Sequence, residues 1–220
     1  MQDRMIYQVE ETREKILQVA EALFQEQGFF DTQMKDVAVQ MGMSRHTLYR
    51  YFRDKADLGH AILVKIFAKL SAQIEKQLEE DLEQRAGPGA SVTAREQLVI
   101  CLTDLFAAPE NQAGLRFMGE FDAFYSGSRI PEDFLDMIAI DFARAEELAG
   151  ELLRYGMDEG SIRTDLEPED LLATCLYSIK ALHQLVAARG GALVGLSSEG
   201  EQQMLQTSVQ LLMDGLKPQI

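Results

Sequence analysis

Apolar residues recur every three to four positions along almost the whole chain, which is the period of an amphipathic α-helix. In residues 12–28, TREKILQVAEALFQEQG, one such helical face carries Ile16, Val19, Leu23 and Phe24. No segment alternates polar and apolar residues strongly enough to predict a β-strand. The sequence therefore predicts an all-α protein of about nine helices.

Glycine, proline and N-capping residues mark where these helices end and begin. Gly28 and Gly42 stand directly after the first two helical patterns, where glycine adopts a positive φ most easily. The strongest break is RAGPGAS, residues 85–91, because two glycines and a proline cannot continue a helix. The expected helices cover about 12–27, 32–41, 44–50, 54–85, 92–107, 110–125, 131–158, 168–189 and 199–215, and the first four have Thr12, Thr32, Ser44 and Asp54 as N-cap candidates.

The charge of the chain is unevenly distributed. The 220 residues carry a formal net charge of −15. Residues 1–65 contain nine basic and ten acidic residues, so the rest of the chain carries −14. An acidic body repels polyanions. A nucleic acid could therefore be bound only through the nearly neutral N-terminal part.

Several classes of protein do not fit this composition. No apolar run approaches the roughly 18 residues of a membrane span, and the charged N-terminus lacks the apolar core of a signal peptide. Cys101 and Cys175 lie far apart in apolar helical contexts, so we expect buried free thiols and a cytoplasmic protein. Because cysteine and histidine do not cluster, we expect neither a metal nor a cofactor.

Residues 38–48, AVQMGMSRHTL, have the spacing of a helix-turn-helix motif. Ala38 is small where two helices cross closely, and Gly42 permits the tight turn between them. Leu48 lies where the second helix must be anchored to the first. At 100° per residue, the second helix places Leu48 opposite a face that carries Arg45, His46, Tyr49 and Arg50.

A short helix with exposed hydrogen-bond donors is typical of a recognition helix in the DNA major groove. Taken alone, the segment could equally be a solvated amphipathic helix, but the preceding helices and Gly42 favour DNA binding. For His46, an ordinary surface histidine is also possible. Flanking candidates for phosphate contact are the hydroxyl of Tyr51, the ammonium of Lys55, and the N–H and hydroxyl of Thr32.

The segment from about Thr12 to Leu58 resembles the DNA-binding domain of the TetR/AcrR family of bacterial transcriptional regulators. The resemblance rests on a glycine-aromatic pair after the first helix, the Ala…Gly-x-Ser turn, and the LY-x-YF-x-x-K sequence. It implies a helix-turn-helix DNA-binding domain at 1–60 and a helical effector-binding and dimerisation domain at 61–220. The implied DNA contacts are Thr32, Ser44, Arg45, His46, Tyr49, Arg50, Tyr51 and Lys55, with His46 replacing a small residue that many members carry.

The C-terminal part resembles the family in outline, through GSIRTDLEPEDLLATCLYSIKAL. In that architecture the eighth and ninth helices form a four-helix dimer interface with their mates. They correspond here to about 168–189 and 199–215. Candidate interface residues are Leu172, Cys175, Leu176, Ile179, Leu182 and Val186, although the helical period does not decide which of them face the partner and which the core.

Residues 106–142 are rich in phenylalanine and methionine. These side chains could form core, or some could line an apolar effector pocket. Candidates for the pocket are Phe117, Phe121, Tyr125 and Met137. The acidic body disfavours a strongly anionic effector, although Arg116 could pair a carboxylate.

Together these features predict a dimeric, ligand-responsive DNA-binding regulator rather than an enzyme. We expect a repressor that a small apolar or amphipathic effector releases from a pseudo-palindromic operator. One alternative keeps the DNA-binding head but has a C-terminal domain that only dimerises or docks a protein. A remote third possibility is an all-α enzyme, for which the sequence offers no convincing nucleophile or metal site.

Overall fold

The computed structural model of the chain describes residues 2–86, 92–125, 131–189, 193 and 195–218. These residues form nine helices and no strand, which confirms the predicted all-α class. The helices are α1 (Gln2–Gln27), α2 (Met34–Gln40), α3 (Arg45–Leu48), α4 (Lys55–Arg85), α5 (Ala94–Ala107), α6 (Pro109–Phe124), α7 (Glu132–Asp158), α8 (Pro168–Arg189) and α9 (Ser198–Gly215).

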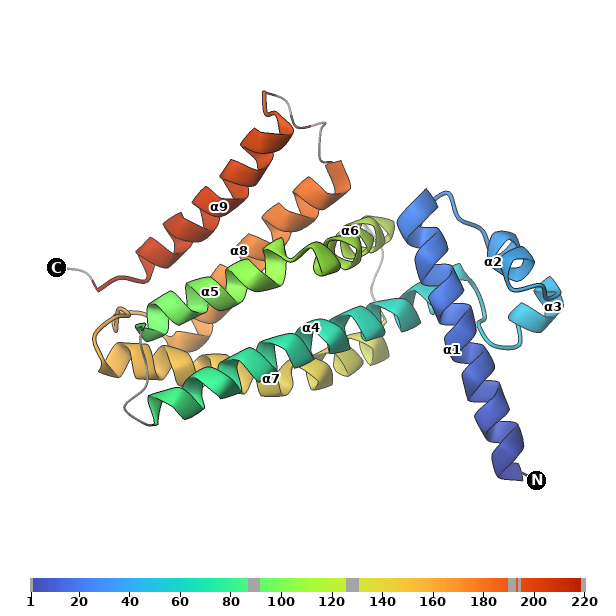
Figure 1. The fold of residues 1–220 in the computed structure, drawn as a ribbon, viewed down its shortest axis with the longest axis horizontal. Coiled ribbons are helices and arrows are strands. Elements are labelled where there is room, and N and C mark those ends of the chain that lie inside the picture. Colours follow the sequence, from blue (N-terminus) through green and yellow to red (C-terminus); the bar gives the residue numbers. More distant parts are fainter. Residues whose placement is uncertain (1, 87–91, 126–130, 190–192, 194, 219–220) are drawn as a thin grey trace.

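The helices are arranged as a head and a body (Figure 1). Helices α1, α2 and α3 form the head at one end, and α4 leads from the head into the body. Within the body α4 packs along α7, α6 packs on α8, and α8 contacts α9. Since α4 is continuous across residue 60, the division of the chain at that point stays a prediction.

Most helix ends follow the chemistry predicted for them. The Ser44 hydroxyl accepts from the Thr47 N–H at 3.1 Å, and the Asp54 carboxylate accepts from the Asp57 N–H at 2.8 Å. Both act as N-caps, as expected. Gly28 and Gly42 have φ of +87° and +64°, the left-handed conformation that glycine permits.

Two predicted N-caps are wrong. Helix α1 begins at Gln2, so Thr12 lies inside it, and its hydroxyl donates back to the Gln8 carbonyl at 2.8 Å. The N-cap of α2 is Gln33 rather than Thr32, because Asp36 reaches back to accept the Gln33 N–H at 2.8 Å. A carboxylate three residues into the helix thus decides where α2 starts.

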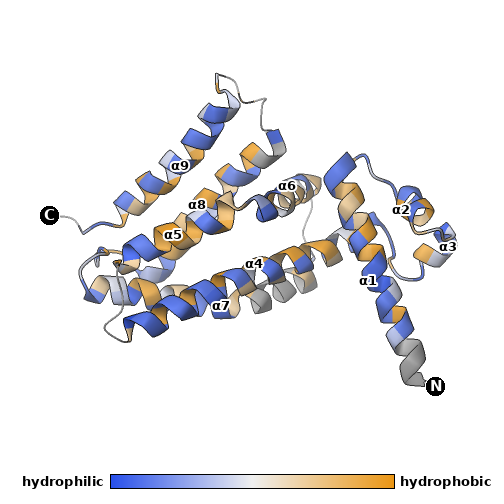
Figure 2. Ribbon diagram, in the orientation of Figure 1, coloured by the Kyte–Doolittle hydropathy of each residue, from blue (hydrophilic) through white to orange (hydrophobic). Residues whose placement is uncertain are grey.

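A buried ion pair closes the end of the body away from the head. The Arg85 guanidinium donates to Asp81 at 2.5 Å and lies over the Tyr155 ring, 5.3 Å from its centroid. Nearby, Glu159 accepts the Ala94 N–H at 2.6 Å. These contacts join the end of α4, the start of α5 and the end of α7. Hydrophobic residues recur among hydrophilic ones along the helices (Figure 2), and the buried ones form a core that runs from head to body.

No helix in the described ranges combines the length and the apolar character that crossing a membrane requires.

Helices α4 and α6 approach closely at Gly59, where a Cβ atom would overlap the Phe121 ring. We therefore expect Gly59→Ala to lower the free energy of unfolding by about 1–3 kcal/mol, since an overpacked site must shift its neighbours. Gly215→Ala is the control, because no atom lies within 4 Å of a Cβ there. Urea denaturation measures both. Equal stability of the two variants would contradict this close packing.

Candidate DNA-binding face and effector cavity

Helix α3 and the turn that follows it present the predicted recognition face. Leu48 is fully buried, whereas Arg45, His46, Tyr49 and Arg50 are exposed. The fold thus leaves all four side chains accessible on the head, opposite the anchoring leucine. Their contact with DNA stays a prediction.

The α2–α3 turn holds this face at a fixed angle to α2. After Gly42 turns the chain, the Met43 N–H donates to the Ala38 carbonyl at 2.9 Å. Ala38 is 2% exposed, as expected for a small residue at a helix crossing. Tyr51 is only partly exposed and packs against the core, and Phe52 is buried under the Arg13 guanidinium, 5.0 Å from the ring centroid.

Thr32 is buried in the head in this structure, and its contact with DNA stays a prediction. Its side chain is fully buried, and its hydroxyl donates to the carbonyls of Gly28 at 2.8 Å and Leu23 at 3.3 Å. The Thr32 N–H also donates to the Gly28 carbonyl. Both groups that we expected to meet DNA therefore close the α1–α2 loop in this structure.

Lys55 is likewise engaged inside the head. Its ammonium donates to the carbonyls of Phe29 at 2.9 Å, Phe30 at 3.1 Å and Thr32 at 3.1 Å, and lies 4.6 Å from the Phe29 ring centroid. Burial lowers the pKa of Lys55, against the opposing effect of Asp31. An ammonium has three donors, so none remains for a phosphate in this conformation. The predicted phosphate anchor instead ties α4 to the α1–α2 loop.

A shallow hollow of about 270 Å³ lies on the head beside the recognition face. Its lining includes four predicted DNA contacts and one further lysine: Thr32, Arg45, Tyr49, Lys55 and Lys35. Lys35 is exposed, and we did not predict it as a site residue. Its place on the polar side of the second helical pattern was visible in the sequence, but its proximity to Arg45 depends on the turn between the helices.

Phe29, at the end of the head, connects the head to the body. Its N–H donates to the Glu120 carboxylate of α6 at 2.6 Å. Its fully buried ring makes edge contacts with Phe121 at 5.1 Å and Phe124 at 5.3 Å. Alongside it, Phe24 of α1 stacks on Phe117 of α6 at 5.5 Å. One face of α6 is therefore bonded to the loop that Lys55 also holds.

A second link joins α6 to the start of α4. The Tyr125 hydroxyl lies 2.8 Å from Nε2 of His60. The centroid of the His60 ring lies 4.4 Å from that of Phe134 in α7 and 5.2 Å from that of Phe121. One turn before His60, Asp57 accepts hydrogen bonds from the backbone N–H and the guanidinium of Arg53. Burial raises the pKa of Asp57, but the contacts with Arg53 lower it further, so the pKa lies below its usual value.

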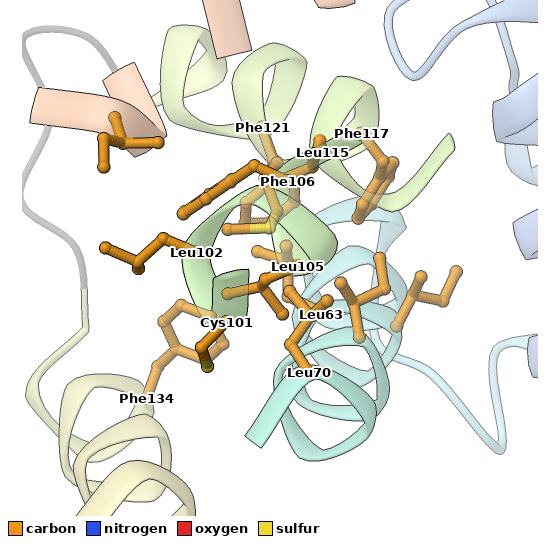
Figure 3. Close-up of a cluster of buried hydrophobic side chains, with 14 of the residues drawn as sticks. Leu63, Leu70, Cys101, Leu102, Leu105, Phe106, Leu115, Phe117, Phe121 and Phe134 are labelled. Atoms are coloured by element: carbon orange, nitrogen blue, oxygen red, sulfur yellow. The ribbon is translucent and has the colours of Figure 1, made fainter. Parts of the chain in front are cut away.

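A cavity of about 380 Å³ lies inside the body, between α4, α5, α6, α7 and α8. Figure 3 shows buried side chains from α4, α5, α6 and α7 converging on the neighbouring interior. Phe121 and Tyr125 line the cavity, as predicted for a pocket. The sequence did not single out Phe67, Tyr177 and Lys180, which complete the wall, because the helical period does not show which helices face one another.

Phe117, another predicted pocket residue, does not line this cavity. Phe117 lines a separate hollow of about 240 Å³ between α1 and α6, together with Arg116. The Phe117 ring stacks on Phe24 of the head and does not point into the cavity. The side chain of Met137 lies outside the described residues.

The dimer candidates on α8 divide into two groups. Cys175 and Ile179 are buried within the chain, so they belong to its own core and not to an interface as predicted. Leu172 and Leu176 are partly buried and line hollows beside α7, while Leu182 and Val186 are partly exposed. The large apolar side chains most exposed on α8 and α9 are Tyr177, Leu185 and Leu211.

The described residues contain no cluster of side chains that could hold a metal ion. Cys101 and Cys175 are free thiols, and burial raises the pKa of Cys101 to about 12 and of Cys175 to about 11. Neither thiol is therefore available as a thiolate at neutral pH.

Comparison with known proteins agrees with this geometry. Residues 16–62 match the family described as "Bacterial regulatory proteins, tetR family". An HTH-type transcriptional regulator of Staphylococcus aureus (strain USA300) is 38% identical over 53 residues, which is 24% of this chain and 29% of that protein. The match thus spans less than a third of the length of the curated relatives.

Solved structures resemble the chain over nearly its full length. A TetR-family regulator from Pectobacterium atrosepticum has a TM-score of 0.67 at 19% identity, covering 96% of both chains. A Saccharomonospora viridis regulator in complex with choline has a TM-score of 0.63 at 20% identity, covering 91% and 96%. Thermus thermophilus FadR in complex with lauroyl-CoA has a TM-score of 0.60 at 19% identity, covering 94% and 96%.

The whole chain thus shares the fold of these solved structures, and its helix-turn-helix head, residues 16–62, matches the tetR family of bacterial regulatory proteins.

Proposed function

We propose that this protein is a sequence-specific DNA-binding repressor whose affinity for its operator is lowered by a small molecule in the body cavity. The observation that carries this proposal is that cavity residues also hold the head. Phe121 lines the cavity and packs on Phe29, and Tyr125 lines the cavity and bonds His60. A ligand that repositions these two side chains acts directly on the contacts that orient the head.

In the DNA complex, Arg45, His46, Tyr49 and Arg50 meet base edges and the adjacent backbone in the major groove. Ser44, Tyr51 and Lys35 lie near enough to this face to serve as backbone contacts, which fix the register of the head on the duplex. Residues 66–220, which make up most of the body, carry a net charge of −14 and are repelled by DNA. Binding therefore depends on the head.

We propose that the protein acts as a homodimer through α8 and α9. Tyr177, Leu185 and Leu211 expose large apolar side chains on these two helices. Apolar side chains at the centre of an interface are the usual source of its stability. Two heads would then occupy successive major grooves, about 34–36 Å apart, on a pseudo-palindromic operator.

Effector response requires that the ligand prefer the conformation in which the heads no longer match the operator. The α6 contacts with Phe29, Gly59 and His60 provide the physical route for this preference. Two proteins of the same fold hold small molecules, choline in one case and lauroyl-CoA in the other. They support a ligand-responsive body over one that only dimerises or docks a protein.

Arg45→Ala tests the recognition face. We expect about tenfold to hundredfold weaker binding to an operator selected from random duplexes, and little change on a scrambled duplex, because a base contact is lost. Fluorescence anisotropy at fixed salt measures both affinities. Lys76→Ala, an exposed lysine of the body, is the control and should change neither. An unaltered affinity of Arg45→Ala for the selected operator would show that the face is wrongly assigned.

Replacing Lys35 by methionine should affect DNA binding, whereas replacing Lys55 by methionine should affect stability. Lys35→Met should weaken binding to all duplexes and reduce the salt slope by about 1, with no change in melting temperature. Lys55→Met should lower the melting temperature, because a hydrogen bond to a charged group contributes about 1.5–3 kcal/mol to the free energy of unfolding. A stable Lys55→Met variant with a reduced salt slope would instead identify Lys55 as a phosphate contact.

Tyr125→Phe tests the route from cavity to head, since it removes only the hydroxyl that bonds His60. With the strongest stabilising compound from a thermal-shift screen as ligand, we expect ligand binding and ligand-free DNA affinity to change by less than about threefold. The ligand-induced loss of DNA affinity should shrink by about fivefold or more, within the usual range of allosteric coupling. Tyr155→Phe, at the far end of the body, is the matched control. Full release of DNA from Tyr125→Phe would remove this hydrogen bond from the mechanism.

A further inference from the structure

Among the residues that the structure describes, the charged side chains lining the body cavity are two carboxylates and one ammonium. The carboxylates are Asp122 of α6 and Glu146 of α7, and the ammonium is Lys180 of α8. The formal charges of these three side chains sum to −1. A bound monocation would neutralise the site, whereas a bound monoanion would raise the local charge to −2. The net charge of −15 on the whole chain adds to this preference for a cation.

Both carboxylates are available to a ligand. Asp122 and Glu146 are exposed, and neither makes an ion pair or hydrogen bond with another residue in the described part of the chain. Glu146 and Tyr177 also line an adjoining groove of about 470 Å³ between α7 and α8. The cavity and this outer groove therefore share a wall that carries Glu146 and Tyr177.

The aromatic wall of the cavity already carries a cation. The Lys180 ammonium lies 5.9 Å from the ring centroids of both Phe67 and Tyr177. Cation–π attraction extends to about 6 Å, so these are contacts at the outer limit of the range. Among the described residues, no carboxylate lies within ion-pair distance of Lys180. Two ring contacts at this distance hold the Lys180 ammonium weakly, so a ligand can displace it.

We propose that the effector is a lipophilic monocation, a protonated amine or quaternary ammonium with an apolar body. Its cationic group replaces the Lys180 ammonium over Phe67 and Tyr177, and the negative charges of Asp122 and Glu146 elsewhere on the cavity wall attract it over a longer distance than an ion pair. Its apolar part lies among the leucine and phenylalanine side chains of the interior, in a volume of about 380 Å³ that suits a small ligand. This inference rests on the proposed function, because it assigns a ligand class to the same cavity.

Isothermal titration calorimetry with three probes of equal chain length tests the proposal. Decyltrimethylammonium should bind more tightly than decanol, and decanoate should bind most weakly, each measured below its micellar concentration. Glu146→Gln and Asp122→Asn should each weaken binding of the cation about twofold to fivefold, the range for an exposed charge pair. Both should leave decanol unchanged. Glu151→Gln, which makes the same charge change elsewhere on α7, is the matched control and should have no effect.

Lys180→Met should change the affinity for the cationic probe and for the anionic probe in opposite directions. It should strengthen binding of decyltrimethylammonium, because it removes a competing ammonium. If decanoate binds most tightly and Lys180→Met weakens it, the effector class is anionic and the proposal is wrong. Equal binding of all three probes would also overturn it, since apolar contact alone would then explain the affinity.

DNA release measured in parallel separates this inference from the proposed function. Release of the selected operator by decyltrimethylammonium, but not by decanoate, supports both. Release by decanoate or decanol alone overturns the cation assignment and leaves the effector-responsive repressor standing. Failure of the ligand-free protein to prefer any DNA sequence would contradict the proposed function, whatever the probes bind.

Discussion

The placement of Phe29 is the constraint on which the rest of the molecule depends. Its ring is fully buried between the head and α6, its N–H is bonded to Glu120, and its carbonyl is bonded to Lys55. A buried backbone N–H or carbonyl must have a partner, and here both partners carry charge. The loop between α1 and α2 is thereby fixed to α4 on one side and to α6 on the other. The orientation of the head consequently depends on the same contacts that hold α4 and α6 of the body together.

This arrangement explains how one side chain can serve two purposes. Phe121 fills the space beside Gly59, contacts Phe29, and forms part of the cavity wall. Interiors are close-packed, so a ligand that displaces such a ring must be accommodated by movement of its neighbours. The neighbours of Phe121 are the first turns of α4 and the loop of the head. The cavity wall and the helix-turn-helix head are thus connected by packing, and the Tyr125–His60 hydrogen bond joins the cavity wall to the start of α4.

The site could be predicted in part from sequence, and the errors share a cause. The exposed face of Arg45, His46, Tyr49 and Arg50 and the buried Leu48 follow from the helical period alone. Thr32 and Lys55 were expected to meet DNA, but their donors are bonded to carbonyls of the α1–α2 loop. Likewise Cys175 and Ile179 turned out to face the core of their own chain. In each case the helical period predicts whether a position is apolar or polar, but it does not show which residues of other helices or loops the side chain contacts.

The sequence by itself determined the all-α class, nearly all helix boundaries, the helix-turn-helix geometry, and the concentration of negative charge outside the head. These depend on local spacing, on capping residues, on glycine at positive φ, and on the distribution of charge, all of which act within a few residues or add up along the chain. Only the tertiary structure decided that Phe67, Tyr177 and Lys180 meet Phe121 and Tyr125 around one cavity, and that Phe117 lies outside it. Those residues come from helices far apart in sequence, and their juxtaposition is set by how the helices pack, which no local pattern encodes.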